Sequence, residues 1–311
     1  MMQDGFYYRP IPQDQGGRWP LAGGWTGFTH LECLQRGAAP RIVDSAPDRV
    51  MAALTAPRPS VLGLTLDRPR LMGIVNATPD SFSDGGRYDP ASQARTLAAD
   101  GADLLDIGGE STRPGAEEIG VPDEIARILP AIEAARGLLP ISVDTRKAAV
   151  AQAALAAGAG MVNDVSGFDF DAGLAPLVAG AGVPVCLMHA QGLPATMQDD
   201  PRYDDVLLDV YDALAARIDR AVRAGVPADR IVIDPGIGFG KTEAHNLAIL
   251  RRISLYHGLG CPILLGVSRK RFIGRIGGAD LAAERMPGTL WPRGSRSTAS
   301  TMSRNTHRGC A

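Results

Sequence analysis

Short apolar runs rich in Val, Ile and Leu recur along the chain from about residue 61, each five to seven residues long. Unbroken runs of this length are typical of strands that are buried on both faces of a parallel sheet. We therefore predict seven strands. They are Leu71 to Asn76, Ala102 to Gly108, Pro140 to Asp144, Gly160 to Asp164, Val183 to His189, Arg230 to Asp234 and Pro262 to Val267.

Segments with helical periodicity separate these runs. The clearest has an apolar residue at every fourth position from Val206 to Val222 and stops before Gly225, where glycine commonly ends a helix. A second, from Lys147 to Ala157, is rich in alanine. Strands that alternate with helices pair in parallel through right-handed crossovers. The order predicts an α/β fold of the (β/α)8 TIM-barrel type, with a doubly wound open sheet as the alternative.

Both ends of the chain differ from this regular middle part. Residues 1–60 hold six of the 16 aromatic residues among glycines and prolines, and we predict an irregular N-terminal extension that packs over one end of the main domain. Residues 290–311 are dominated by Ser, Thr and Arg without an apolar run of strand length, which is typical of a disordered tail. The barrel domain is expected over residues 61–289, without a regular eighth strand or last helix.

The composition narrows the class of protein. Hydrophobic residues make up 45% and charged residues 21% of the 311 residues, which is enough to close a large core. A formal charge of −2 gives no positive field for nucleic acids or anionic membranes. The four scattered cysteines indicate neither a disulfide framework nor a zinc cluster, and no segment has the pattern of a signal peptide or a membrane span. We expect a cytoplasmic protein that binds neither nucleic acid nor membrane.

Polar residues follow the predicted strands at the point where each strand ends. Carboxyl ends of parallel strands lie on one face, where barrel enzymes place their chemistry, so residues far apart in sequence are expected to meet at one mouth. The strand ends carry Asn76, Asp144, Asn163, Asp164, His189 and Asp234, and the loops after the second and seventh strands carry Glu110, Ser111, Thr112, Arg113, Ser268, Arg269 and Lys270.

This mixture of carboxylates, amides and cations suits a ligand with an anionic end and a hydrogen-bond-donating end. Asp234 ends an apolar strand, and a cyclic guanidine-like edge with two adjacent N–H donors would satisfy both of its oxygens. The segment Gly236 to Thr242 fails both the Walker A and the dinucleotide patterns. It leaves a glycine-rich turn, with Phe239 at its centre, that can approach a flat ligand. His189 fits two roles, a hydrogen-bonded support or a direct ligand contact.

Several of these segments resemble, in the same order, the signature segments of the dihydropteroate synthase family. The matching segments are Asn76 to Gly86, Asp106 to Pro114, Ser142 to Thr145, Asn163 to Asp164, Met188 to His189, Asp234 to Lys241 and Gly266 to Lys270. The resemblance covers roughly residues 61–289. It implies a TIM-barrel transferase of folate biosynthesis that condenses 6-hydroxymethyl-7,8-dihydropterin pyrophosphate with p-aminobenzoate, giving dihydropteroate and pyrophosphate.

The same resemblance implies roles for individual residues. Asp144, Arg113 and Lys270 would be catalytic, and Asn76 would help to coordinate Mg²⁺ on the pyrophosphate. The expected substrate contacts are Thr112, Asp144, Asn163, Met188, Asp234, Phe239, Gly266, Ser268, Arg269 and Lys270, and the expected mobile loop contains Thr78, Pro79, Asp80, Ser81 and Phe82. The two small-molecule substrates and a second copy of the chain, in a homodimer, are the implied partners.

The chemistry of this reaction fits those roles. Loss of pyrophosphate leaves a cation delocalised into the pterin ring, which Asp144 could stabilise, while Mg²⁺ and basic side chains stabilise the leaving group. An aniline nitrogen is already neutral at ordinary pH, so positioning by the loops matters more than a general base. We assign no general base.

The resemblance ends near residue 289. The family continues to an eighth strand that ends in an Arg-x-His pair, and we do not assign His307 and Arg308 to that pair. The changed composition leads to the hypothesis that the tail is out-of-frame or replaced sequence, and that the chain is weakly stable and weakly active. Two other functions stay open, a methyltetrahydrofolate-dependent methyltransferase and a non-catalytic pterin-binding remnant.

Overall fold

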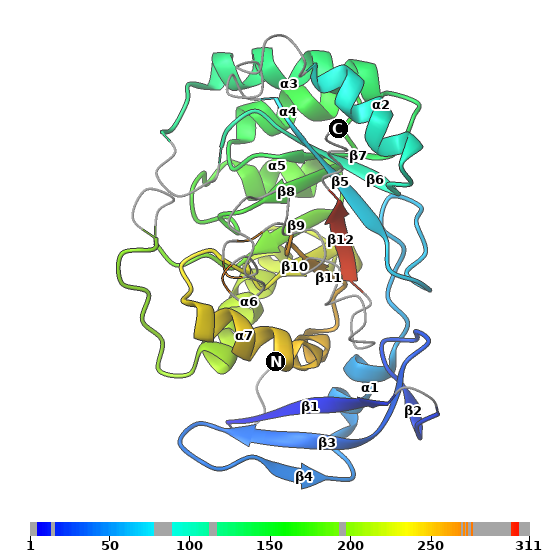
Figure 1. Ribbon diagram of the computed structural model, residues 1–311, viewed down its shortest axis with the longest axis vertical. Coiled ribbons are helices and arrows are strands. Elements are labelled where there is room, and N and C mark those ends of the chain that lie inside the picture. Colours follow the sequence, from blue (N-terminus) through cyan, green and yellow to red (C-terminus); the bar gives the residue numbers. More distant parts are fainter. Residues whose placement is uncertain are drawn as a thin grey trace.

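The structure is a computed structural model that describes residues 5–13, 16–77, 89–111, 117–192 and 197–268, the positions 270, 272 and 275, and the backbone of 300–304. Figure 1 shows strands surrounded by helices, with a small sheet of N-terminal residues beside them. Among the helices in these ranges, none combines the length and the apolar character needed to cross a bilayer.

Eight parallel strands close into a barrel, which confirms the predicted fold and excludes the open sheet. The strands are β5 (Leu71–Asn76), β6 (Leu104–Gly108), β7 (Ile141–Asp144), β8 (Met161–Asp164), β9 (Val185–Met188), β10 (Ile231–Asp234), β11 (Ile263–Leu265) and β12 (Ser300–Arg304). Three of them begin directly after Pro140, Pro184 and Pro262. Proline cannot donate to a strand ladder, so these strands are shorter than the apolar runs that contain them.

Helices follow the strands and form the outer ring. They are α2 (Pro90–Ala99), α3 (Val121–Ala135), α4 (Ala148–Ala157), α5 (Leu174–Ala181), α6 (Val206–Arg223) and α7 (Glu243–Arg251), with short 3-10 turns η2 (Ala228–Arg230) and η3 (Ile253–Leu259). The Asp205 side chain accepts from two backbone N–H groups at the start of α6, and Gly158 takes the left-handed conformation at the end of α4. Both devices satisfy backbone groups that a helix end leaves unpaired.

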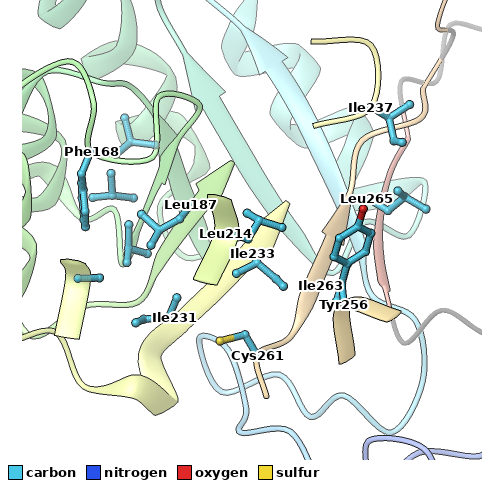
Figure 2. Packing of buried hydrophobic residues seen from close by; sticks show 14 of the residues in the cluster. Phe168, Leu187, Leu214, Ile231, Ile233, Ile237, Tyr256, Cys261, Ile263 and Leu265 are labelled. Atoms are coloured by element: carbon cyan, nitrogen blue, oxygen red, sulfur yellow. The ribbon is translucent and has the colours of Figure 1, made fainter. Parts of the chain in front are cut away.

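The core has two layers that the barrel wall separates. Successive residues of a strand point to opposite faces, so alternate residues pack under the helices. Figure 2 shows Leu187 and Ile233, from neighbouring strands, close to Leu214 of α6. The residues of opposite parity fill the inside of the barrel with a cluster of Met72, Leu104, Met161, Cys186, Val232 and Leu264. The barrel interior is therefore packed, and space for a ligand can exist only above this layer.

The eighth position of the barrel is filled by β12. It pairs in parallel with β11, where Leu264 is opposite Thr301, and with β5, where Met302 is opposite Leu71. The prediction that the barrel lacks a regular eighth strand is therefore wrong for residues 300–304. Strand pairing uses backbone groups, and β11 and β5 would otherwise present two open edges. A segment without an apolar run can thus occupy the gap between them.

The N-terminal residues form a four-stranded antiparallel sheet, followed by a helix. Its elements are β1 (Phe6–Gln13), β2 (Trp19–Pro20), β3 (Gly27–Gln35), β4 (Arg41–Val43) and α1 (Asp48–Thr55). The description of this extension as irregular is therefore wrong. Its prolines are tolerated because β1 is an edge strand whose register shifts between Pro10 and Pro12, where a missing ladder donor does little harm.

This N-terminal sheet packs against α6 and η3. The ring of Tyr7 meets that of Tyr211 edge-on at 5.4 Å between centroids, and its hydroxyl donates to Asp212 over 2.8 Å. Glu32 of β3 pairs with Arg252, the residue before η3, over 3.1 Å. Aromatic packing and half-buried ion pairs therefore join the sheet to the barrel. The domain boundaries at residues 60 and 289 stay predictions.

Candidate active site

The register of the strands brings three predicted site residues to the same end of the barrel. Asn76 is opposite Gly108, Gly108 is opposite Asp144, and Asp144 is opposite Asn163, across β5, β6, β7 and β8. Asn163 follows Met161 of the interior cluster by two positions, so its side chain has the same inward parity. Asp234 follows Val232 of that cluster in the same way. The polar strand ends thus form a second layer above the apolar filling.

Asp164 does not join this layer. It has the opposite parity to Asn163, and its carboxylate accepts from the backbone N–H of Ser166 over 2.8 Å and of Phe168 over 2.6 Å. Its hydrogen bonds shape the turn after β8, although burial raises its pKa. Parity therefore separates the polar strand ends that face the mouth from those that support a loop.

Asp234 lies buried at the end of β10, beside Met188 of β9 in the strand register. Its Oδ1 accepts from the backbone N–H of Gly236 over 2.7 Å. A Cβ on Gly266 would lie 3.7 Å from its Oδ2, so the chain after β11 passes against the carboxylate. Burial raises the pKa of Asp234 to about 6, against the lowering by the Gly236 N–H and by the charges of Lys270 and Lys241. At neutral pH the carboxylate is mostly ionised and fitted to accept from N–H donors.

Lys270 and Phe239 meet beside this carboxylate. The Lys270 ammonium lies 4.3 Å from the centre of the Phe239 ring, a distance at which the ring face attracts a cation. Desolvation lowers the pKa of Lys270 to about 8, and the charge of Asp234 opposes that shift. Ser268, also predicted, lies half-buried in the loop after β11. The loops after β10 and β11 therefore converge on Asp234.

Asp144 ends β7 close to several other carboxylates. Burial raises its pKa well above the ordinary value, and the neighbouring carboxylates Asp106, Glu124, Asp164 and Glu110 raise it further. A nearby positive charge or N–H donor opposes such a shift and favours the ionised carboxylate. The site is therefore prepared to interact more strongly with a ligand that develops positive charge.

Asp106 was not among the predicted site residues. This carboxyl is buried in the middle of β6, and its Oδ2 accepts from the Asn163 side-chain amide over 2.8 Å. Burial raises its pKa, while the hydrogen bond from Asn163 lowers it. The sequence contained a signal for this role, because Asp106 is a charged residue within an apolar run, at a position that faces the inside of the barrel. Asp106 orients the amide of a predicted site residue.

His189 is hydrogen-bonded to its protein neighbours, as the first of its two predicted roles requires. Its Nδ1 lies 3.0 Å from the Lys241 ammonium, and its backbone N–H donates to the Asp234 carbonyl over 2.9 Å. Burial, and then the charges of Lys241 and Arg217, lower the pKa of His189 to about 2. The imidazole is therefore neutral, with Nδ1 accepting from the lysine. The sequence placed Lys241 in a glycine-rich turn and in the segment Asp234 to Lys241, without a role of its own.

A buried ionic network lies at the start of the loop after β6. The Lys147 ammonium donates to Glu110 and, over 2.7 Å, to Glu124, and Arg146 pairs with Glu110 over 2.6 Å. Thr145 completes it with a hydroxyl donated to Glu124 over 2.7 Å. Glu110 is thereby tied to the segment that follows Asp144. This network joins the segments that follow β6 and β7.

Eight predicted site residues lie outside the described residues. They are Thr78, Pro79, Asp80, Ser81, Phe82, Thr112, Arg113 and Arg269. Their expected roles stay predictions.

Among the described residues, no cluster of three or more His, Cys, Asp or Glu side chains could hold a metal ion. Mg²⁺ needs fewer protein ligands when it arrives on a phosphate, since it keeps several waters and takes one or two protein oxygens. Asn76, half-buried at the carboxyl end of β5, carries an oxygen of the right type. The residues present thus fit a substrate-borne ion.

The model of the pterin binding enzyme family matches residues 72–292. The chain is 44% identical over 243 residues to the dihydropteroate synthase of Synechocystis sp., covering 75% of this chain and 84% of that protein. It is 42% identical over 233 residues to the Escherichia coli dihydropteroate synthase, covering 73% and 82%. The matched region is the barrel, and the N-terminal sheet precedes it.

Solved structures give the same result. The dihydropteroate synthase of Xanthomonas albilineans in complex with 7,8-dihydropteroate superposes with a TM-score of 0.70 at 43% identity, covering 79% of this chain and 92% of that one. The Xanthomonas albilineans enzyme with 4-aminobenzoic acid gives a TM-score of 0.71 at 46% identity, covering 77% and 89%.

Proposed function

The chain belongs to the pterin-binding enzyme family, and we propose that it is a transferase with dihydropteroate synthase activity, joining 6-hydroxymethyl-7,8-dihydropterin pyrophosphate to p-aminobenzoate. The observation that carries the proposal is the meeting of Asp144, Asn163 and Asp234 at one mouth of a barrel that matches the family over residues 72–292. Similarity to the dihydropteroate synthases argues against a methyltetrahydrofolate-dependent methyltransferase.

In this proposal the pterin ring binds against Asp234. One carboxylate oxygen already accepts from Gly236 N–H, and the lone pairs that remain suit the two adjacent N–H donors of the guanidine-like edge. Asn163 presents an amide oriented by Asp106, and Lys270 with Phe239 forms the neighbouring wall. Met188, Gly266 and Ser268 would complete the contacts.

The bond changes need little from the protein beyond charge stabilisation. The bond between the pterin methylene carbon and the pyrophosphate oxygen breaks, the amine nitrogen bonds to that carbon, and the amine then releases a proton. Asp144 would stabilise the positive charge on the pterin in the transition state, because that charge favours the ionised form of a carboxyl whose pKa is raised in the free protein. Positioning of the amine would supply the rest.

The leaving group needs positive charge. We assign that task to Lys270 and Arg113, with Asn76 holding Mg²⁺ that enters on the pyrophosphate. The ion, when bound, neutralises phosphate charge. Thr112 and Arg269 are proposed to contact the substrates, and the loop from Thr78 to Phe82 to help position them.

A direct assay tests the proposal. The purified chain with both substrates and Mg²⁺ is expected to form dihydropteroate and pyrophosphate in equal amounts. Asp234→Asn keeps the shape but removes the ionic acceptor, so kcat/KM for the pterin substrate should fall by roughly a hundredfold, the size of effect expected for a buried charged hydrogen bond. Pterin binding without turnover would select the non-catalytic alternative, and methyl transfer from methyltetrahydrofolate would select the methyltransferase.

Two further expectations are measured on the same preparation. The composition of the tail predicts weak turnover, which the assay quantifies against a relative of known activity. The family resemblance predicts a homodimer, which light scattering measures. The cytoplasmic location also stays a prediction.

A further inference from the structure

Lys241 is a buried cation that lies between two loops of the mouth. Its Nζ is 3.0 Å from His189 Nδ1 and 3.2 Å from the His189 carbonyl, both in the loop after β9. It is also 2.9 Å from the carbonyl of Gly236 and 3.0 Å from that of Phe239, both in the loop after β10. One ammonium group therefore has four acceptors from two loops, and its three protons cross-link them.

The two loops approach each other too closely for side chains between them. Gly236 has φ +67°, and a Cβ there would lie 1.9 Å from the His189 carbonyl oxygen. Gly240 has φ +60°, and a Cβ there would lie 2.3 Å from the carbonyl oxygen of Gln191. Glycine is required at both positions for conformation and for space. The loops thus bring several carbonyl oxygens together, and these repel each other unless a cation lies among them.

The groups that Lys241 holds are the immediate neighbours of the mouth. Gly236 donates its N–H to Asp234, and His189 donates its N–H to the Asp234 carbonyl. Phe239 places its ring 4.3 Å from the Lys270 ammonium. Lys241 therefore bonds to the residues whose own contacts orient the Asp234 carboxylate and the Lys270 ammonium.

We propose that Lys241, through its cross-link to His189, is a positioning residue that fixes the loop carrying Phe239 and thereby the relative placement of Asp234 and Lys270 for binding the pterin. This inference rests on the proposed function. The Lys241 ammonium bonds to the His189 imidazole and to backbone carbonyls rather than to the side chains of Asp234 or Lys270, so its role differs from theirs. It acts through the carbonyl groups and the imidazole that it holds.

The expected effect falls on substrate binding. Without the ammonium, the His189 imidazole and the carbonyls of His189 and Phe239 lose this donor, while the Gly236 carbonyl keeps the Phe239 N–H. The two loops then lose the cation that cross-links them. Asp234 and Lys270 keep their charges but lose their mutual placement. The Asp144 side of the mouth, which would stabilise the reacting carbon, keeps its own strand register.

Lys241→Met tests this because it keeps the length of the side chain and removes the charge. We expect KM for the pterin substrate to rise by about tenfold or more, with KM for the amine and kcat within roughly threefold of wild type, as for lost ground-state and transition-state binding of one substrate. Unchanged pterin KM, or a fall in kcat alone, would overturn the inference.

His189 supplies a matched pair of variants. His189→Asn keeps an acceptor near the position of Nδ1, and His189→Leu has similar bulk without one. We expect His189→Leu to raise the pterin KM, as Lys241→Met does. His189→Asn should keep most of the wild-type affinity for the pterin substrate. Equal pterin KM values for these two variants would contradict the inference. This pair decides the question if Lys241→Met fails to fold.

Failure of the proposed function gives a different result. If the wild-type protein shows neither dihydropteroate synthase nor methyltransferase activity, binding of 6-hydroxymethylpterin is measured by calorimetry in place of kinetics. Weaker binding to Lys241→Met and His189→Leu than to His189→Asn would still support the inference. Equal binding would refute it.

Discussion

Asn163 of β8 donates its side-chain amide to Asp106 of β6 over 2.8 Å, reaching past the intervening strand β7. An amide has a donor end and an acceptor end, so this bond sets which end of Asn163 faces Asp106. The orientation of a proposed substrate contact is therefore determined two strands away.

Substitution at Asp106 tests that orientation. Asp106→Asn keeps a carbonyl oxygen for the Asn163 amide, and burial already raises the pKa of this carboxyl, so kcat/KM is expected to stay within about threefold. Asp106→Leu leaves the amide without its acceptor, and pterin KM should rise by roughly tenfold. Steady-state kinetics of the two variants, with thermal melts alongside, make the comparison. Equal loss in both would show that charge, not orientation, is what Asp106 contributes.

The pKa values of the mouth predict a bell-shaped dependence of kcat/KM on pH. Burial raises the pKa of Asp234 to about 6, so acidification below this value protonates the acceptor and weakens pterin binding. Burial lowers the pKa of Lys241 to about 7 and that of Lys270 to about 8, so alkalisation removes first the charge that cross-links the loops and then the charge of the mouth. Since kcat/KM reports the free enzyme, its two limbs should lie near these values.

Two variants identify the groups behind the limbs. Asp234→Asn should flatten the acid limb, and Lys270→Arg should move the alkaline limb to higher pH, because arginine stays charged. The measurement is kcat/KM for the pterin substrate from pH 5 to 9.5. Limbs that both variants leave in place would assign the titration to the substrate.

The buried, neutral His189 should make the folded protein less stable in acid. Burial lowers its pKa in the folded protein to about 2, from an ordinary value of 6.5. Below pH 6.5 the unfolded chain binds a proton that the folded chain refuses, so the free energy of unfolding should fall by about 1.4 kcal/mol for each pH unit. Lys241, whose pKa is lowered to about 7, is largely charged in both states over the lower part of this range.

The control is His189→Asn, which has no titrating group there. The difference in unfolding free energy between wild type and this variant, from urea titrations at several pH values between 6.5 and 4.5, isolates the histidine. A difference that does not change with pH contradicts a buried neutral imidazole.

The network around Lys147 predicts a large effect on stability. The side chains of Lys147, Glu110 and Glu124 are exposed by 5%, 9% and 1%. Lys147→Met leaves two buried carboxylates with less compensation, at a cost of about 3–5 kcal/mol. The matched control is Arg202→Met, which breaks an ion pair with Asp200 whose side chains are exposed by 85% and 64% and should change stability by less than about 1 kcal/mol. Urea unfolding of both variants checks the ratio, and equal effects would contradict it.

The barrel strands could be predicted because they depend on local pattern. Runs that end in Asn76, Asp144 and Asp234 became strands that end at the same residues. Parallel pairing then placed those ends together without further information. Asp106 and Lys241 were missed for the opposite reason, since their roles depend on partners 57 and 52 residues away.

The two ends of the chain show where local pattern fails. β12 is held by the backbone edges of β11 and β5, and its own residues carry no strand signal. In β1 the prolines conceal a strand because the shift between Pro10 and Pro12 accommodates them. Both segments take their structure from neighbours rather than from the period of their own side chains.

The lysine shared by two loops constrains how this protein can be recombined with its relatives. A chimaera that takes the segment after β10 from another member, but keeps its own segment after β9, separates the Lys241 ammonium from the imidazole and carbonyl of His189 that it was shaped to meet. When the segments after β9 and β10 are both taken from the same relative, the contacts between them are kept. The two segments form one exchangeable unit, although the whole of α6 lies between them in the chain.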